Sequence, residues 1–134
     1  MPSAKNILLV DDDADDLAML HEALVQVGCN YEIKEAADGE KALQYLIART
    51  QVEPLPALIV LDINMPRLDG KQTLAAIKAS PAFAAIPVVI FSTSSNSFDQ
   101  LFASAYNVEI ITKPFDVATL HQIASRLLHY VMTN

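Results

Sequence analysis

The sequence predicts an α/β fold: a doubly wound parallel sheet of five strands in the order 2-1-3-4-5. Two observations carry this prediction. Short apolar runs alternate with helix-patterned segments along the whole chain, and most of these runs are apolar without interruption. Uninterrupted apolar strands indicate burial on both faces, as in a parallel sheet between two layers of helices. The 134 residues are enough for one such domain, with 52% hydrophobic residues to fill its core.

The first half of the chain predicts two β/α units and a third strand. Ile7–Val10 is an apolar strand, and the helix from about Ala14 has leucines at helical spacing and ends at Gly28. A weakly alternating strand and an amphipathic helix follow, and a short apolar strand comes next. Their expected ranges are Tyr31–Ala36, Gly39–Arg49 and Leu58–Leu61.

The second half continues the alternation, so the chain contains five β/α units in all. A helix, a strand and a second helix are followed by a short strand and a last amphipathic helix. Their expected ranges are Lys71–Ala79, Val88–Phe91, about Phe98–Ala105, Val108–Ile111 and about Val117–Val131. We expect one domain over residues 1–134, with its core at about 6–131 and no effector domain.

Charge and composition exclude several classes of function. Sixteen acidic residues against nine Lys and Arg give a net charge of −7, which argues against binding to nucleic acid or to an anionic membrane. Cys29 is the single cysteine and cannot form an internal disulfide. No apolar run has the length of a membrane span or the character of a signal peptide. We therefore expect a cytoplasmic location.

Polar residues follow four of the expected strands directly. In a doubly wound sheet, ligands bind beyond the carboxyl ends of the strands. The residues expected there are Asp11-Asp12-Asp13, Asp62, Ser92-Thr93 and Lys113-Pro114. Neighbouring carboxylates repel one another unless a cation compensates their charge, and Mg²⁺ prefers such oxygen ligands.

A carboxylate nucleophile, a metal, an ammonium and a hydroxyl around one point form a phosphoryl-transfer site. Asp62 is the candidate nucleophile because it stands alone at the centre of the sheet. Asp13, Asp15 and Asp16 are interpreted as acids at the start of a helix, where the helix dipole favours them. A calcium loop beginning at Asp11 is excluded, since its sixth position requires glycine and is Asp16 here.

From about Asn6 to Tyr130, the chain resembles the receiver domain of two-component response regulators, whose fold is flavodoxin-like. Five stretches carry the resemblance: the acidic pair Asp11-Asp12, the segment 37–43, the segment 58–70 around Asp62, the segment 87–92 with its hydroxyl at Ser92, and Lys113-Pro114-Phe115. The longer Thr50–Pro56 loop and the segment 91–95 are similar to regulators that partner bacterial phytochromes.

The resemblance implies a role for each site residue. Asp62 would accept a phosphoryl group, and Ser92 and Lys113 would bind the phosphoryl oxygens. Asp12 would bind Mg²⁺ directly and Asp11 through water, with Asp62 and the main-chain carbonyl of Asn64 as further ligands. Mn²⁺ would substitute for Mg²⁺.

The resemblance also implies the partners and the local geometry. The Lys113–Pro114 bond is expected to be cis, and Asn64 and Ser94 would flank the water that removes the phosphoryl group. The donor would be a sensor histidine kinase or a histidine phosphotransfer protein. Many receivers have an aromatic residue three positions before the lysine, but this chain has Ile110.

We expect a stand-alone receiver that signals to a downstream protein by phosphorylation-dependent contact and is not an enzyme beyond self-phosphotransfer and auto-dephosphorylation. Its output face would be the fourth helix, fifth strand and fifth helix, which would also serve a homodimer. Two alternatives stay open. One is a degenerate receiver that binds partners without phosphate. The other is a small phosphohydrolase of the haloacid-dehalogenase type, with Asp11 as nucleophile and Asp13 as acid/base.

Overall fold

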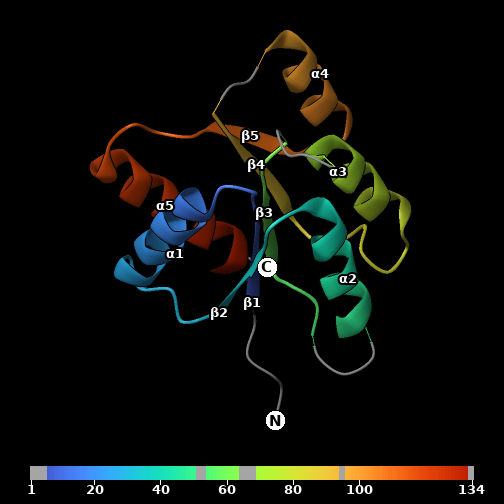
Figure 1. The fold of residues 1–134 in the computed structure, drawn as a ribbon, viewed down its shortest axis with the longest axis horizontal. Helices are drawn as coiled ribbons and strands as arrows, with labels where there is room; N and C mark the ends of the chain where they lie inside the picture. Colours follow the sequence, from blue (N-terminus) through green and yellow to red (C-terminus); the bar gives the residue numbers. More distant parts are fainter. Residues whose placement is uncertain (1–5, 51–53, 64–68, 94–95, 133–134) are drawn as a thin grey trace.

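The structure, a computed structural model, describes residues 6–50, 54–63, 69–93 and 96–132. Its strands form one parallel sheet in the order β2-β1-β3-β4-β5, which confirms the predicted fold class and strand order (Figure 1). The strands are β1 (Asn6–Val10), β2 (Glu32–Ala36), β3 (Leu58–Leu61), β4 (Val88–Ser92) and β5 (Glu109–Thr112).

Helices follow each strand, and every predicted helix is present with its bounds shifted by a few residues at most. They are α1 (Ala14–Gln26), α2 (Gly39–Arg49), α3 (Gly70–Ala79), α4 (Ser97–Ala105) and α5 (Val117–Met132). Side chains at the N-caps explain where the first four begin: Asp13, Asp38, Asp69 and Asn96 each accept hydrogen bonds from main-chain N–H groups of the first turn.

Two apolar layers cover the two faces of the sheet. On one face, α1 and α5 pack together, and residues such as Leu24 and Leu127 are fully buried against Ile7 and Leu9. On the other face lie α2, α3 and α4, with Leu46 and other side chains packed on β1 and β3 (Figure 1). Every residue of β1, β3 and β4 is buried, as their uninterrupted apolar sequences predict.

β2 lies at one end of the strand order and differs in composition from the central strands. Glu32 and Glu35 are exposed on it, and Lys34 is half-buried and pairs with Glu32 at 2.7 Å. The strand was predicted from weak alternation, and the structure shows why the signal is weak. An outer strand has a partner on one side and needs fewer apolar side chains than β1 does.

One predicted local feature is wrong. The Lys113–Pro114 bond is trans in the structure, whereas the resemblance implied cis. Trans is the intrinsically preferred form even before proline. The Lys113 side chain is positioned by its contacts with carboxylates, described below.

Within the described residues, none of the helices combines the length and the apolar character that a bilayer crossing requires. Several large apolar side chains are nevertheless exposed. Phe98 and Leu101 lie on α4, and Phe115 lies just before α5.

Candidate functional site

The candidate site lies at the carboxyl end of the sheet, where β1, β3, β4 and β5 finish. Strand register explains how residues far apart in sequence meet there. Val10 pairs with Leu61, so Asp11 and Asp62 are the next residues on adjacent strands. Ser92 pairs with Thr112, and the Lys113 N–H donates to the Ser92 carbonyl at 2.8 Å. The structure therefore brings together the polar residues that the sequence placed at four strand ends.

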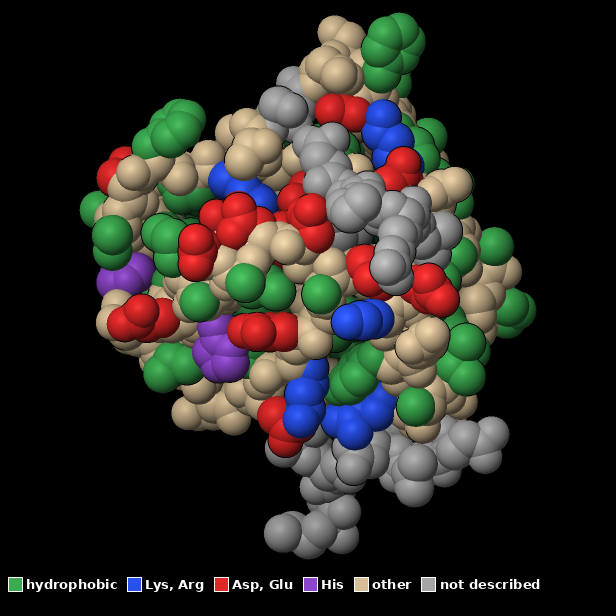
Figure 2. Space-filling view, in the orientation of Figure 1, with side chains coloured by type: hydrophobic (Ala, Val, Ile, Leu, Met, Phe, Trp, Pro, Cys, Tyr) green, Lys and Arg blue, Asp and Glu red, His purple; other side chains and the backbone are tan. Residues whose placement is uncertain are grey.

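These polar side chains are buried, which is unusual for charged groups. The exposed fractions are 5% for Asp11, 6% for Asp62, 1% for Ser92 and 8% for Lys113. Buried charges are costly unless they are paired. We therefore expect the buried carboxylates and the buried ammonium to pair with one another. Figure 2 shows acidic side chains gathered near the upper middle of this face, beside a basic one.

Lys113 is the centre of this arrangement. Its Nζ donates to Asp11 Oδ2 at 2.6 Å and to Asp62 Oδ2 at 3.3 Å, and both contacts are buried. A third contact reaches Asp16 Oδ2 at 2.7 Å. The ammonium therefore bridges the first strand end, the third strand end and the first turn of α1.

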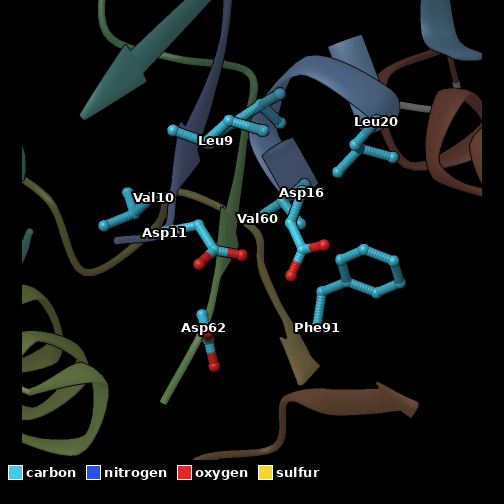
Figure 3. A pocket seen from close by; sticks show the side chains of 9 residues that line it. Leu9, Val10, Asp11, Asp16, Leu20, Val60, Asp62 and Phe91 are labelled. Carbon is cyan, nitrogen blue, oxygen red and sulfur yellow. The ribbon is translucent and has the colours of Figure 1, made fainter. Parts of the chain in front are cut away.

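The Asp16 contact was not predicted from the sequence. Asp16 was interpreted as an acid in the first turn of a helix, and it is that, but its carboxylate is also directed to Lys113. Figure 3 shows the Asp16 side chain from α1 on the same side as Asp11, beside Phe91. By contrast, Asp13 is confirmed as the N-cap of α1, since its side chain accepts from the N–H groups of Asp15 and Asp16.

Burial and pairing shift the pKa values of two site residues in the same direction. Burial raises the pKa of Asp11 to about 6, and the nearby charge of Asp62 adds to that, while the Lys113 contact opposes it. Burial alone would lower the pKa of Lys113, but its contacts with Asp11 and Asp16 raise it well above the ordinary range. These contacts therefore favour the charged form of Lys113.

Three carboxylates at this end of the sheet suit a metal ion. Ligand oxygens of Asp11, Asp12 and Asp62 lie within 4.8 Å of one another. Asp11 and Asp62 are buried and Asp12 is exposed, so the group opens to solvent on one side. Hard oxygen ligands favour Mg²⁺, Mn²⁺ or Ca²⁺ over softer metals. Asp11 and Asp62 are both buried, and their negative charges repel each other. A divalent cation bound between them would reduce this repulsion. The other expected ligand, Asn64, lies outside the described residues.

The hydroxyl position also agrees with the sequence analysis. Ser92 is the last residue of β4 and is buried, while Thr93 is exposed. Ser92 ends β4 and Lys113 comes directly after the neighbouring strand β5, and the Lys113 ammonium lies 3.3 Å from Asp62 Oδ2. Ser94, expected to flank the water, lies outside the described residues.

Gly70 contributes to the site through its backbone. A Cβ built on Gly70 would lie 2.2 Å from the Asp62 carbonyl oxygen and 2.3 Å from Ile63 Cα. The first residue of α3 therefore packs directly on the main chain of the candidate nucleophile. Sequence analysis placed Gly70 at an element end but did not predict this close approach.

A second ion pair lies beyond the site, between α3 and α4. Lys71 Nζ contacts Asp99 Oδ1 at 2.7 Å and lies 5.8 Å from the centre of the Phe102 ring. Phe102 in turn packs edge-on against Tyr106 at 5.1 Å. Ile110, which stands where many receivers have an aromatic residue, is partly buried beside this group. Aromatic side chains are thus present near β5, on α4 instead of on the strand.

Comparison with known proteins places this geometry in a family. The model of the response regulator receiver domain matches residues 7–125. Among curated proteins, response regulator Rcp1 of Synechocystis is 39% identical over 97 residues, which are 71% of this chain and 66% of Rcp1. Transcriptional regulatory protein PrrA of Mycobacterium leprae is 38% identical over 119 residues, which are 88% of this chain and 47% of PrrA. The chain thus spans about two thirds of one relative and about half of the other.

Solved structures agree with the sequence relatives. The crystal structure of the phosphorylated cyanobacterial phytochrome response regulator RcpA is similar at a TM-score of 0.86 and 33% identity, covering 98% of this chain and 96% of that chain. The Mn²⁺-bound form of Rcp1 follows at a TM-score of 0.78 and 32% identity, covering 91% and 90%. The similarity to phytochrome-associated regulators agrees with the resemblance drawn from the sequence.

Proposed function

The chain belongs to the response regulator receiver family, and from that premise we propose that it accepts a phosphoryl group on Asp62 and passes the signal on by protein contact. The observation that carries the proposal is the geometry of Lys113. Its buried ammonium lies 3.3 Å from Asp62 Oδ2. A fixed positive charge beside a buried carboxylate suits a group that is to become an acyl phosphate of greater negative charge.

The chemistry assigns one role to each residue. An Asp62 oxygen attacks the phosphorus of a phosphohistidine, a new P–O bond forms as the P–N bond breaks, and the released imidazole nitrogen takes up a proton. Lys113 and the Ser92 hydroxyl donate hydrogen bonds to the phosphoryl oxygens. No other side chain needs to form a covalent bond. Hydrolysis by water would later restore the Asp62 carboxylate.

A divalent cation is part of the proposal. Asp11, Asp12 and Asp62 would bind Mg²⁺, with the main-chain carbonyl of Asn64 as a further ligand, and Mn²⁺ would substitute for it, as the Mn²⁺-bound form of Rcp1 suggests. When bound, the ion supplies positive charge that offsets the repulsion between the carboxylates and an incoming phosphoryl group.

The partners follow from the same chemistry. The phosphoryl donor would be a sensor histidine kinase or a histidine phosphotransfer protein, and the receiver of the signal a downstream protein. Exposed Phe98 and Leu101 on α4 support an output surface on the α4–β5–α5 face, which would also serve a homodimer. The acidic net charge of −7 gives no support for nucleic acid or an anionic membrane as a partner.

The phosphohydrolase alternative finds little support in the geometry. It requires Asp11 as nucleophile and Asp13 as acid/base. The Asp13 carboxylate accepts two main-chain N–H bonds at the start of α1, and Asp11 is paired with Lys113. The Asp13 carboxylate is therefore engaged in capping α1, and this reaction would leave the buried Asp62 without a role.

The test uses a small phosphoryl donor. The protein is incubated with Mg²⁺ and phosphoramidate, and its intact mass is followed over time beside Asp62→Asn and a metal-free sample. Asp38→Asn is the matched control, because Asp38 is also a buried aspartate but caps α2, a role that asparagine can fill. We expect one added phosphoryl group in wild type and in Asp38→Asn. An adduct that persists in Asp62→Asn would show that another residue is the acceptor, and no adduct in any sample with metal bound would favour a degenerate receiver.

A further inference from the structure

The first turn of α1 contributes a carboxylate that the family resemblance did not assign. Asp16 contacts Lys113 at 2.7 Å, nearly as closely as Asp11 does at 2.6 Å and more closely than Asp62 at 3.3 Å. We propose that Asp16 is a positioning residue that fixes the Lys113 ammonium so that its remaining N–H points at the acceptor. The proposal rests on the proposed function of Asp62 and assigns a further residue to that site.

The donor geometry of lysine supports this assignment. An ammonium has three N–H donors. Two short contacts, to Asp11 and Asp16, fix the position of Nζ from two sides. The third and longest contact is directed to Asp62 Oδ2. A phosphoryl oxygen on Asp62 can therefore take this third donor without displacing either of the other two.

Asp16 is suited to the role because it lies outside the metal group. Asp11 and Asp62 belong to the three carboxylates whose oxygens lie within 4.8 Å of one another, and Asp16 does not. A cation bound to that group would reduce the attraction of Asp11 and Asp62 for Lys113. The full charge of Asp16 would remain available to the ammonium, so Lys113 would stay in place in the metal-bound form.

The surroundings of Asp16 restrain its carboxylate. Its main-chain N–H donates to the Asp13 carboxylate at 3.2 Å, which fixes the first turn of α1 at this point. Its side chain borders a small cavity lined partly by Leu20 and Phe91 (Figure 3). The Asp16 side chain in this ion pair is 31% exposed. Apolar neighbours of this kind exclude water on one side and strengthen the attraction between the two charges.

Asp15 offers a matched comparison in the same turn. Asp15 is exposed, and the carboxylates that contact Lys113 within the described part of the chain are those of Asp11, Asp16 and Asp62. Asp15→Asn and Asp16→Asn remove the same unit of charge from adjacent positions of the same helix. A difference between the two variants therefore reports the contact with Lys113 and not the net charge.

Two measurements test the proposal on Asp16→Asn, Asp15→Asn and Asp16→Glu. The first is the rate of phosphorylation by phosphoramidate with saturating Mg²⁺, followed by intact mass across donor concentrations. We expect the maximal rate of Asp16→Asn to fall about tenfold below that of Asp15→Asn, since a misplaced catalytic group can cost up to 10²-fold. The donor concentration at half-maximal rate should change little, and Asp16→Glu should recover part of the rate.

The second measurement follows the Lys113 ammonium itself by ¹H–¹⁵N NMR without any phosphoryl donor. We expect a slowly exchanging NH₃⁺ signal in wild type and Asp15→Asn, and a faster exchanging or broadened signal in Asp16→Asn. Thermal unfolding of each variant shows whether it is folded. A merely structural role of Asp16 would lower stability without changing the ammonium signal in the folded protein.

The outcomes separate this proposal from the proposed function. If Asp16→Asn and Asp15→Asn are phosphorylated at equal rates and keep equal ammonium signals, the positioning role of Asp16 is overturned while the function of Asp62 stands. If wild type takes no phosphoryl group, the proposed function fails and takes the catalytic part of the proposal with it. The ammonium signals then decide separately whether Asp16 fixes Lys113.

Discussion

Gly70 lies so close to Asp62 that a Cβ on Gly70 would come within 2.2 Å of the Asp62 carbonyl oxygen. The start of α3 is therefore in close backbone contact with the segment directly after β3, which contains the candidate nucleophile. A methyl group at this point would have to push α3 away or move the main chain of Asp62. The position of Asp62 thus depends on residue 70 being a glycine, which has no Cβ.

We predict that Gly70→Ala lowers the free energy of unfolding by about 1–3 kcal/mol, the usual cost of inserting a methyl group into a packed region. It should also weaken binding of Mg²⁺, because Asp62 belongs to the carboxylate group. Urea unfolding and calorimetric metal titration check the two effects. Gly28→Ala is the comparison, since Gly28 has a φ of +98° with open space around it. That variant should lose stability but keep its metal affinity.

Removing the charge of Lys113 should tighten metal binding. In Lys113→Met, a positive charge near Asp11 and Asp62 is lost, so a cation meets less repulsion. We expect the dissociation constant for Mg²⁺ to fall about five- to tenfold. This is the effect expected from removing the repulsion of one unit charge that lies a few ångströms away and is partly screened by solvent. Isothermal titration calorimetry measures it. Lys78→Met, in the last turn of α3, makes the same charge change and should leave the affinity near that of wild type.

The ion pair between α3 and α4 predicts a pH-dependent contribution to stability. The hydrogen bond from Lys71 holds the pKa of Asp99 below its ordinary value. The native state thus binds the proton less tightly than the unfolded state, so the stabilisation is complete above a pH of about 4 and is lost as the pH falls through the native pKa. Lys71→Gln should raise the pKa of Asp99, which ¹³C NMR of its carboxyl group measures.

The stability difference between wild type and Lys71→Gln should therefore be constant near neutral pH and shrink in acid. Urea unfolding at several pH values between 3 and 7 checks this. The difference should shrink in acid because the pKa of Asp99 is lowered in the native state. A difference that grew towards acid would contradict the prediction.

A partly buried hydrogen bond connects the beginning of β1 to α2. Asn6 is fully buried, its Oδ1 accepts from the Tyr45 hydroxyl at 3.1 Å, and its Nδ2 donates to the Pro54 carbonyl at 3.3 Å. Tyr45→Phe should cost about 1 kcal/mol in the free energy of unfolding, the usual value of one such bond. Tyr106→Phe, at the C-cap of α4, controls for loss of a tyrosine hydroxyl. Equal stability losses in the two variants would show that the Asn6 contact contributes nothing.

The predicted part of the site is the part that topology determines. Parallel strands finish at one end of a sheet, so any polar residue directly after an apolar strand belongs there whatever its sequence number. This reasoning placed Asp11, Asp62, Ser92 and Lys113 together, and the structure confirms it. The fold was predicted from the same strands, because an uninterrupted apolar strand needs to be covered on both faces, and a parallel sheet between two helix layers provides this.

The remaining features depend on side-chain directions and close approaches that residue types do not determine. Asp16 and Lys113 are 97 residues apart, and their contact requires that α1 turn one specific carboxylate toward β5. The backbone contact at Gly70 likewise depends on the angle at which α3 leaves the site. The Lys113–Pro114 bond was predicted wrongly because the expectation came from a resemblance and not from the surroundings of the bond.

The two outer strands of the sheet differ in how readily they would pair with another chain. β2 has Glu32, Lys34 and Glu35 within five residues, so an added strand would bury charges beside it. β5 has Ile110 and Ile111 between Glu109 and Thr112, which is a more permissive surface for strand addition. Unwanted growth of the sheet, and with it aggregation from partly unfolded molecules, should therefore begin at β5, where a charged substitution would protect the protein most.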